Sequence, residues 1–505
     1  MWQKASEVNE MNRFYGCSTK SFIPLIMHIL LTGSTGYIGK RLLSELVQNG
    51  HTLSCCVRDK NRFNLPDLSL PEDAPPIDQI IRVIEVDLTD ASSLQNIPGD
   101  IDAAYYLVHS MSSSVDYERV EAECARNFKD RIEQTSAKQV IYLSGIVNQE
   151  KLSEHLNSRK RVEQLLHSEH YALTTLRAGI IVGSGSASFE IIRDLVEKLP
   201  VMIAPKWLKT RTQPIGISDV LKFLTGVLGR EETYNHHYDI GSDDILTYKE
   251  MLLGFAEVRG LNRHIWTVPV MTPKLSSYWL YFVTSTSYLL ARSLVDSMKI
   301  EVVCEPNELR ELLGIQPISY RAALLKAFHK IEQDQIASSW KDSYASSGTT
   351  IAIEKYSMVP RFGCFTDIRR HSIRDREQTI AKVWSIGGHN GWYFGTWLWQ
   401  IRGFLDKLIG GVGLRRGRTN QDSIAVGDAL DFWRVVDVDK AKGRLLLFAE
   451  MKLPGEAWLE FKIEDDLLVQ TATFRPLGIS GRLYWYSVLP FHGIIFSGLI
   501  RKLCE

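Results

Sequence analysis

The feature that most limits the fold of this chain is a glycine-rich segment directly after a short apolar run. Residues 28–33 predict a buried strand, and residues 37–48 predict a helix with one leucine-rich face. Between such elements, one glycine permits a tight turn, another lets the backbone approach a phosphate, and a third lets the helix pack closely on the strand. The helix N-terminus then offers free N–H groups to a pyrophosphate. We therefore predict a dinucleotide-binding loop, the alternative being a turn without a ligand. The loop residues are Thr32, Gly33, Thr35, Gly36, Tyr37, Ile38 and Gly39.

Beyond this loop, short apolar runs alternate with amphipathic helical stretches. Such alternation predicts a parallel sheet that is covered by helices on both faces. The expected fold class is therefore α/β, a doubly wound Rossmann sheet over residues 27–230 with a helical cap over residues 231–337. The expected strands are 28–33, 52–57, 81–87, 103–109, 139–145 and 172–182, and the expected helices of this sheet are 37–48, 117–135 and 153–168.

Composition limits the remaining possibilities. The 505 residues suffice for two or three domains, and 59 basic residues balance 59 acidic ones, which argues against nucleic-acid binding. The seven scattered cysteines contain no CxxC pair, so we expect reduced thiols, no metal site and a cytoplasmic location. Residues 1–26 form a tail before Met27 that we expect not to be native. A stretch rich in serine and threonine at 338–350 predicts a linker to a second domain at 351–505.

The glycine spacing is TGxxGxxG, and with it residues 27–230 resemble the extended or atypical short-chain dehydrogenase/reductase superfamily. The resemblance implies a nicotinamide cofactor. Arg58 at the end of the second strand, with Arg41 beside the loop as a second candidate, favours NADP(H), because arginine pairs with a 2′-phosphate. The adjacent Asp59 leaves NAD(H) open. The resemblance also implies that Asp87 and Leu88 hold the adenine. It places Val108 and His109 beneath the nicotinamide ribose.

The catalytic positions depart from this superfamily. Its usual Tyr-xxx-Lys pair performs the proton chemistry, but here His155 and Arg159 stand at those two positions. His155 could serve as a general acid, whereas Arg159 could serve only as a fixed charge. Ser144 ends the fifth strand near the usual catalytic serine or threonine, although the register places Gly145 and Ile146 there equally well. The alternative is a surface histidine and a helix-facing arginine without a chemical role.

This departure resembles a bacterial subgroup of atypical reductases related to NmrA-like sensors and to the accessory Rossmann subunit of respiratory complex I. Two hypotheses follow from the resemblance. The first is an NADP(H)-dependent oxidoreductase acting on a hydrophobic carbonyl or quinone-like compound. The second is a non-catalytic NADPH-binding sensor or assembly protein whose C-terminal domain holds an apolar ligand. The sequence leaves the oligomeric state undetermined.

The last third of the chain is built differently, because seven of the twelve tryptophans lie between residues 384 and 485. Strand-like runs at 362–371, 425–438, 443–451, 457–463 and 467–474, with a final helix at 487–503, predict an antiparallel α+β domain. This order resembles the helix-grip fold of START and polyketide-cyclase-like (SRPBCC) proteins, which implies a hydrophobic small-molecule ligand. The alternative is that the tryptophans are core residues.

Two charge-free runs, 275–291 and 483–500, reach only the lower edge of membrane-spanning length. We expect buried helices there, with peripheral contact to a membrane surface as the alternative. The basic run Arg415-Arg416-Gly417-Arg418 reads most simply as a solvated turn, and a phosphate or membrane-surface contact is the alternative.

Overall fold

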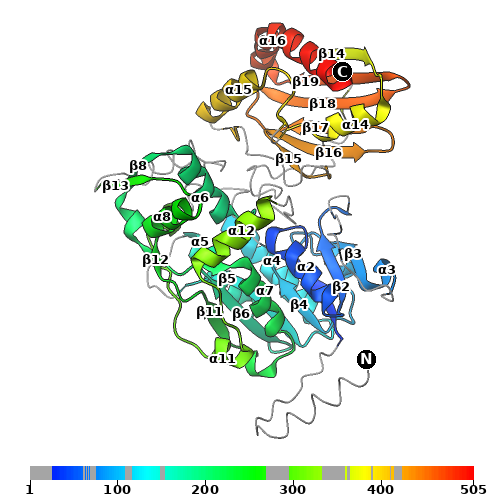
Figure 1. Ribbon diagram of the computed structural model, residues 1–505. Coiled ribbons are helices and arrows are strands. Elements are labelled where there is room, and N and C mark those ends of the chain that lie inside the picture. Colours follow the sequence, from blue (N-terminus) through cyan, green and yellow to red (C-terminus); the bar gives the residue numbers. More distant parts are fainter. Residues whose placement is uncertain are drawn as a thin grey trace, which may run out of the picture.

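The computed structural model describes residues 26–60, 63, 65, 68, 75–108, 117–147, 154–268, 295–332, 359–360, 364–387, 390–409, 411–413 and 424–505. Two sheets organise these residues, one in each half of the chain (Figure 1). Residues 1–25 of the expected tail, the charge-free run at 275–291, the linker at 338–350 and the arginine run at 415–418 lie outside the described residues.

The N-terminal sheet has seven parallel strands in the order β11-β6-β5-β4-β1-β2-β3 (Figure 1). Helices α2 and α7 contribute to the core on one face, and α4 and α5 contribute to the core on the other. This confirms the doubly wound α/β prediction. The order reverses between β1 and β4, which is where such sheets bind ligands at the carboxyl ends of their strands. The strands are β1 (His28–Leu31), β2 (Thr52–Val57), β3 (Ile81–Glu85), β4 (Ala103–Tyr106), β5 (Gln139–Gly145), β6 (Ala172–Ala178) and β11 (His237–Ile240). The helices are α2 (Tyr37–Gln48), α4 (Tyr117–Ile132), α5 (Glu154–Leu166) and α7 (Ile217–Gly226), with the short α3 (Ile77–Ile80) before β3.

A second layer, formed by residues after β6, has its own hydrophobic core. It contains the helices α6 (Ala187–Lys198), α8 (Tyr248–Val258) and α12 (Tyr320–Glu332). Three short strand pairs accompany these helices, although the sequence predicted a helical cap alone, and β11, from beyond residue 230, adds an edge to the main sheet. The pairs are β7 (Ile181–Val182) with β10 (Ile215–Gly216), β9 (Arg211–Thr212) with β12 (Leu246–Thr247), and β8 (Val201–Pro205) with β13 (His264–Val268).

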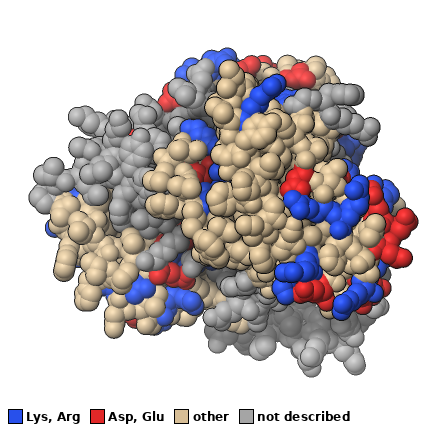
Figure 2. Space-filling model, turned by 90° about the horizontal axis from the view of Figure 1, so that it is seen from above, with Lys and Arg blue, Asp and Glu red and all other residues tan. Residues whose placement is uncertain are grey.

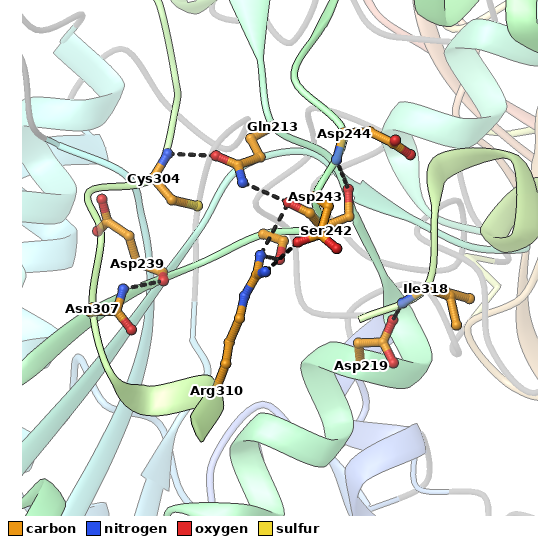
Figure 3. A network of polar contacts seen from close by, with 11 residues as sticks. Gln213, Asp219, Asp239, Ser242, Asp243, Asp244, Cys304, Asn307, Arg310 and Ile318 are labelled. Atoms are coloured by element: carbon orange, nitrogen blue, oxygen red, sulfur yellow. Dashed lines mark hydrogen bonds and ion pairs between the residues drawn. The ribbon is translucent and has the colours of Figure 1, made fainter. Parts of the chain in front are cut away.

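A polar network fastens the segment before α12 to this layer (Figure 3). Gln213 accepts a hydrogen bond from the Cys304 amide at 2.9 Å and donates one to the Ser242 carbonyl at 2.6 Å. The side chain of Arg310, in α11 (Leu309–Leu313), donates to the carbonyls of residues 241 and 242. Buried Asp219 accepts from the Ile318 amide at 2.9 Å. The network therefore holds residues 304–318, and the segment just before them, in one place.

The C-terminal domain is a six-stranded antiparallel sheet with a terminal helix, as predicted for its α+β class. Strands β15 to β19 form a meander, and β14 joins its far edge beside β19. Helix α16 packs on β14 and β19 and begins nine residues earlier than expected. Helix α15 was not predicted. The strands are β14 (Phe365–Ser372), β15 (Ala429–Leu430), β16 (Trp433–Asp439), β17 (Arg444–Ala449), β18 (Gly455–Glu464) and β19 (Leu467–Pro476). The helices are α14 (Arg376–Trp384), α15 (Thr396–Leu408) and α16 (Gly478–Cys504).

Six of the seven tryptophans of this domain are buried, and Trp397 is exposed. Rings of Trp392, Trp399 and Trp433 contact one another or Phe432 inside the core. The alternative that most of these tryptophans are core residues is therefore confirmed. The resemblance to the helix-grip fold stays a prediction.

Candidate functional site

The predicted loop has the backbone geometry that its glycines suggested. Gly33 has a φ of 69°, and a Cβ at this position would lie 2.7 Å from the Leu107 carbonyl oxygen. A Cβ at Gly39 would lie 2.2 Å from the Gly33 carbonyl oxygen, so no larger residue allows α2 to pack this close to the turn. The N-cap Gly36 makes no side-chain cap, and the first turn of α2 contains no acidic residue. The N-terminus of α2 is thus suited to an anion such as a pyrophosphate.

Side-chain hydrogen bonds fasten the loop to the strands on both sides. The Thr32 hydroxyl donates to the Tyr105 carbonyl at 2.9 Å and accepts from the Leu107 amide at 3.1 Å, next to β4. The Ser34 hydroxyl, which the sequence did not single out, donates to the Cys56 carbonyl on β2 at 3.0 Å. Thr35 is half-buried. The loop is therefore held in place before any ligand binds.

The residues expected around the adenosine lie at the carboxyl ends of β2 and β3. Arg58 is exposed directly after β2, and Asp87 is half-buried, with its carboxylate accepting from the Thr89 amide at 2.9 Å. Burial raises the pKa of the Cys124 thiol to about 12, with Asp87 raising it further and Arg58 lowering it, so the three side chains lie near one another. The Leu88 side chain packs in the core.

Arg41, which the sequence suggested as a second partner for a 2′-phosphate, instead contacts Tyr37 and Ser184. Its guanidinium lies 4.2 Å from the ring centroid of Tyr37 and donates to the Ser184 carbonyl at 2.9 Å. Only 7% of Arg41 is exposed, and burial lowers its pKa. Burial also raises the pKa of Tyr37 to about 12, so its phenol remains protonated. Arg41 therefore joins the glycine loop to the second layer.

A cavity of about 460 Å³ begins at this loop. Its near wall contains Gly33, Gly36, Tyr37, Ile38, Gly39 and Leu107, and its floor contains Ser144 and Arg159. The far wall comes from the second layer and is mostly apolar, with Ile180, Ile191, Leu195, Met202, Leu252 and Val302 among its members. Val302 lies on the segment that the polar network fastens, since its amide donates to the Arg211 carbonyl and its carbonyl accepts from the Gln213 amide.

Two of the three predicted catalytic residues, Ser144 and Arg159, line this cavity. The Ser144 hydroxyl is buried and has no hydrogen-bond partner within the described residues. The Arg159 guanidinium donates to the Tyr142 hydroxyl and to the Leu143 carbonyl, both at 3.4 Å. Burial alone would lower the pKa of Arg159, but Tyr142 and Glu121 raise it above its ordinary value. Arg159 is therefore a permanent positive charge at the cavity floor.

The other predicted positions are only partly described. Residue 155 lies in the first turn of α5, but the side chain of His155 is outside the described part of the structure. Val108 follows β4 and packs against the core of α4 and α5, and His109 is outside the described residues. Their expected roles stay predictions.

Three residues at the far end of the cavity were missed. Trp207, Thr212 and Tyr248 line it, and the rings of Trp207 and Tyr248 lie 6.3 Å apart and nearly perpendicular. Burial raises the pKa of Tyr248, an effect that the nearby Thr212 hydroxyl opposes. The Trp207 indole N–H has no acceptor within the described residues. Trp207 lies far from the tryptophans in the last third of the chain, and this separate position could have marked it as a candidate site residue.

The residues present fit a nicotinamide dinucleotide. The glycine turn and the uncapped α2 N-terminus suit its phosphates. The cavity that starts there contains the positively charged Arg159 and the Ser144 hydroxyl, which has no hydrogen-bond partner in the described part of the chain. Across the described residues, no group of three His, Cys, Asp or Glu side chains could hold a metal ion.

Two family models match separate parts of this chain. Residues 29–177 match the family described as NAD dependent epimerase/dehydratase family, and residues 363–499 match the family described as a protein of unknown function (DUF2867). The chloroplastic divinyl chlorophyllide a 8-vinyl-reductase of Oryza sativa subsp. indica is 26% identical over 233 residues, which are 44% of this chain and 56% of that protein. The chain thus spans little more than half the length of this relative.

Solved structures with similar folds include a nucleoside-diphosphate-sugar epimerase from Staphylococcus aureus, with 16% identity, 59% of this chain and 99% of that chain covered, and a TM-score of 0.46. The WbmG enzyme of Bordetella bronchiseptica, in complex with NAD and UDP, has 13% identity, 63% and 98% coverage, and a TM-score of 0.47. In sequence, the family match means that residues 29–177 resemble the epimerase/dehydratase family. The family description and the glycine loop together support a nicotinamide cofactor.

Proposed function

We propose that this chain is an NADP(H)-dependent oxidoreductase that reduces a hydrophobic carbonyl or quinone-like compound. The observation that carries the proposal is the cavity, because it connects the glycine loop to Ser144 and Arg159 and continues between apolar side chains. The exposed Arg58 after β2 supports NADP(H) over NAD(H), since its charge suits a 2′-phosphate. The reductase name of the rice relative is consistent with a reduction.

Different residues of the chain would bind the cofactor, stabilise negative charge and donate a proton. A bound reduced nicotinamide supplies a hydride. The α2 N-terminus and the loop amides bind the phosphates, and Arg159 provides a fixed positive charge at the cavity floor. The Ser144 hydroxyl is available to donate a hydrogen bond to a substrate oxygen on which negative charge develops. His155 remains the candidate proton donor, because an imidazole titrates near neutral pH.

The lining of the cavity supports a hydrophobic substrate. Arg159 is the one charged side chain among its described lining residues. A nucleotide sugar carries a diphosphate, and recognition of a diphosphate calls for several basic or N–H groups. Isoleucine, leucine and methionine side chains instead favour an apolar body. At the far end, the Trp207 N–H and the hydroxyl of Thr212 or Tyr248 would take a polar substituent of that substrate.

The second candidate is a non-catalytic NADPH-binding sensor. It is favoured by Arg159, which stands where a lysine would take part in proton transfer and which is fixed by Tyr142 and Leu143. An arginine keeps its proton at every accessible pH. In this case the chain would bind NADPH and the apolar ligand without oxidising the cofactor.

A cofactor-oxidation assay separates the two candidates. The full chain is titrated with NADPH and NADH by fluorescence, and NADPH absorbance is then followed with quinones, aldehydes and conjugated enones. We expect tighter binding of NADPH and oxidation with at least one compound. Binding of NADPH without oxidation by any of them would favour the sensor, and tighter binding of NADH would contradict the NADP(H) assignment.

Variants on one helix supply the matched control. Arg159→Met removes the cavity charge, whereas Arg161→Met changes an exposed neighbour on α5. We expect Arg159→Met and Ser144→Ala each to lower kcat by about 10- to 100-fold, equivalent to about 1.4–2.7 kcal/mol. Arg161→Met should keep the wild-type rate. Full turnover of a His155→Ala/Arg159→Ala variant would exclude the proposed roles of both residues.

A further inference from the structure

The C-terminal domain has an exposed apolar surface on two helices. We call it the apolar face; on α15 it comprises Trp397, Ile401, Phe404, Leu405, Leu408 and the following Ile409, and on α16 it comprises Ile479, Leu483, Tyr486, Leu489, Phe491 and Ile494. The α15 members recur at helical spacing on one side of the helix. Trp397 is 61% exposed, Phe404 60% and Ile479 78%. Exposed large apolar residues at this density mark an interaction site.

Hydrogen bonds fix the outward orientation of α15. Asp406 is buried on the opposite side of the helix, where its carboxylate accepts from the Gly413 amide at 2.8 Å and from the Lys452 amide at 2.7 Å. Rotating the helix to bury the apolar stripe would break both hydrogen bonds. The stripe therefore faces outward in the folded domain.

The two helices are joined to each other. The Arg402 guanidinium lies 5.2 Å from the ring centroid of Tyr484, and the rings of Trp399 and Phe496 lie 6.3 Å apart in the core. Figure 2, viewed from above, shows a broad area without charged side chains, and both basic and acidic side chains lie around its margin. Helices α15 and α16 thus lie next to each other in the domain (Figure 1).

The charged residues of these helices have one predominant sign. Together α15 and α16 contain five basic residues and a single acidic one, Asp406, which is buried. Arg482, Arg501 and Lys502 are exposed, and the last two pair with the terminal Glu505. Arg482 and Arg402 thus place positive charge beside the apolar side chains, where it would complement an anionic surface.

We propose that the apolar face docks on an anionic phospholipid bilayer, with its apolar side chains in the boundary between headgroups and acyl chains. Tryptophan, tyrosine and phenylalanine favour this boundary, and basic side chains beside them attract anionic headgroups. A second copy of the chain is a poorer occupant, because it would bring the same positive charges to the interface. This proposal does not depend on the proposed reaction.

The alternative of a membrane-spanning α16 is less consistent with its packing. Among the described residues, α16 is the one helix that is long and apolar enough to cross a membrane by length and composition, and 28% of its most apolar stretch is buried. One side of α16 packs into the domain, and most of its buried residues belong to the hydrophobic core. These buried residues are Trp485, Phe496, Leu499, Ile500 and Leu503. Docking by the outer side keeps these contacts, whereas insertion across a bilayer would remove them.

Flotation of the full chain with vesicles tests the proposal. We expect binding to vesicles that contain phosphatidylglycerol, weaker binding to phosphatidylcholine alone, and release by high salt or alkaline carbonate. The variant Trp397→Ser/Phe404→Ser should lower the fraction bound by about tenfold or more. Trp266→Ser is the matched control, because Trp266 is 64% exposed on β13 and outside the apolar face. It should bind as the wild type does.

Each other outcome overturns the proposal. Failure of the wild type to float, or equal loss of binding in both variants, would show that the apolar face does not dock on lipid. Resistance to carbonate would indicate a spanning helix. A dimer in light scattering that Trp397→Ser dissociates, without vesicle binding, would assign the face to a second copy of the chain.

Discussion

Replacing Gly33 with alanine tests the geometry on which cofactor binding depends. The φ of 69° would cost an L-residue about 1–2 kcal/mol. The new Cβ would also lie 2.7 Å from the Leu107 carbonyl oxygen, a distance that Cβ atoms do not adopt. The contact is with a backbone atom, so no side-chain rotation can relieve it, and the turn itself must move away from β4. The N–H groups of the loop would then no longer point toward the phosphates of the cofactor.

Gly50, at the other end of α2, provides the control. Its φ is 87°, and a Cβ there would meet nothing within 4 Å. Gly50→Ala therefore carries the backbone strain of about 1–2 kcal/mol without a clash. The comparison separates lost stability from lost loop geometry, because both variants affect the ends of one helix.

The assay is fluorescence titration with NADPH, together with melting of the full chain. Hydrogen bonds to a charged group contribute about 1.5–3 kcal/mol each, so loss of one phosphate contact should raise Kd by at least about tenfold in Gly33→Ala. Gly50→Ala should keep the wild-type Kd and show a lower Tm. Unchanged NADPH affinity in Gly33→Ala, or an equal loss in Gly50→Ala, would refute the assignment of this loop to the phosphates.

Three further predictions concern stability. Burial lowers the pKa of His492 to about 4, whereas the unfolded imidazole takes up its proton near pH 6.5, so unfolding free energy is lost as the pH falls from 6.5 to 4. Tryptophan fluorescence should show a loss of up to about 3 kcal/mol, and His492→Phe should flatten this acid dependence. The ion pair between Arg434 and Glu450 is buried, so Glu450→Ala should cost about 3–5 kcal/mol in urea unfolding, against less than about 1 kcal/mol for Glu464→Ala in an exposed pair. Asp219→Ala leaves the Ile318 amide without its acceptor, and we expect a loss of about 1–3 kcal/mol, measured by thermal melting; an unchanged Tm would contradict the role of the network.

Six of the seven strands of the first sheet, and the near wall of the cavity, could be predicted from the sequence alone, whereas β11 could not. The helix at 37–48 and the strand at 139–145 were predicted with the bounds that α2 and β5 have. The glycine motif also placed Gly33 and Gly39 in the turn, whereas the sequence left Ser144, Gly145 and Ile146 as equal candidates for the catalytic position. These features depend on backbone conformation and on the periodicity of neighbouring residues, and both are local properties of the chain.

The residues that complete the cavity and the exposed side of α15 depend on tertiary packing, which the sequence pattern does not show. Trp207, Thr212 and Tyr248 meet Ser144 and Arg159 through long-range packing. Arg41 packs on Tyr37 because Ser184 offers it a carbonyl acceptor. The apolar stripe of α15 faces outward because Asp406 satisfies two backbone amides from other segments. Periodicity identifies an apolar stripe, but the surroundings decide whether core, solvent or a partner covers it.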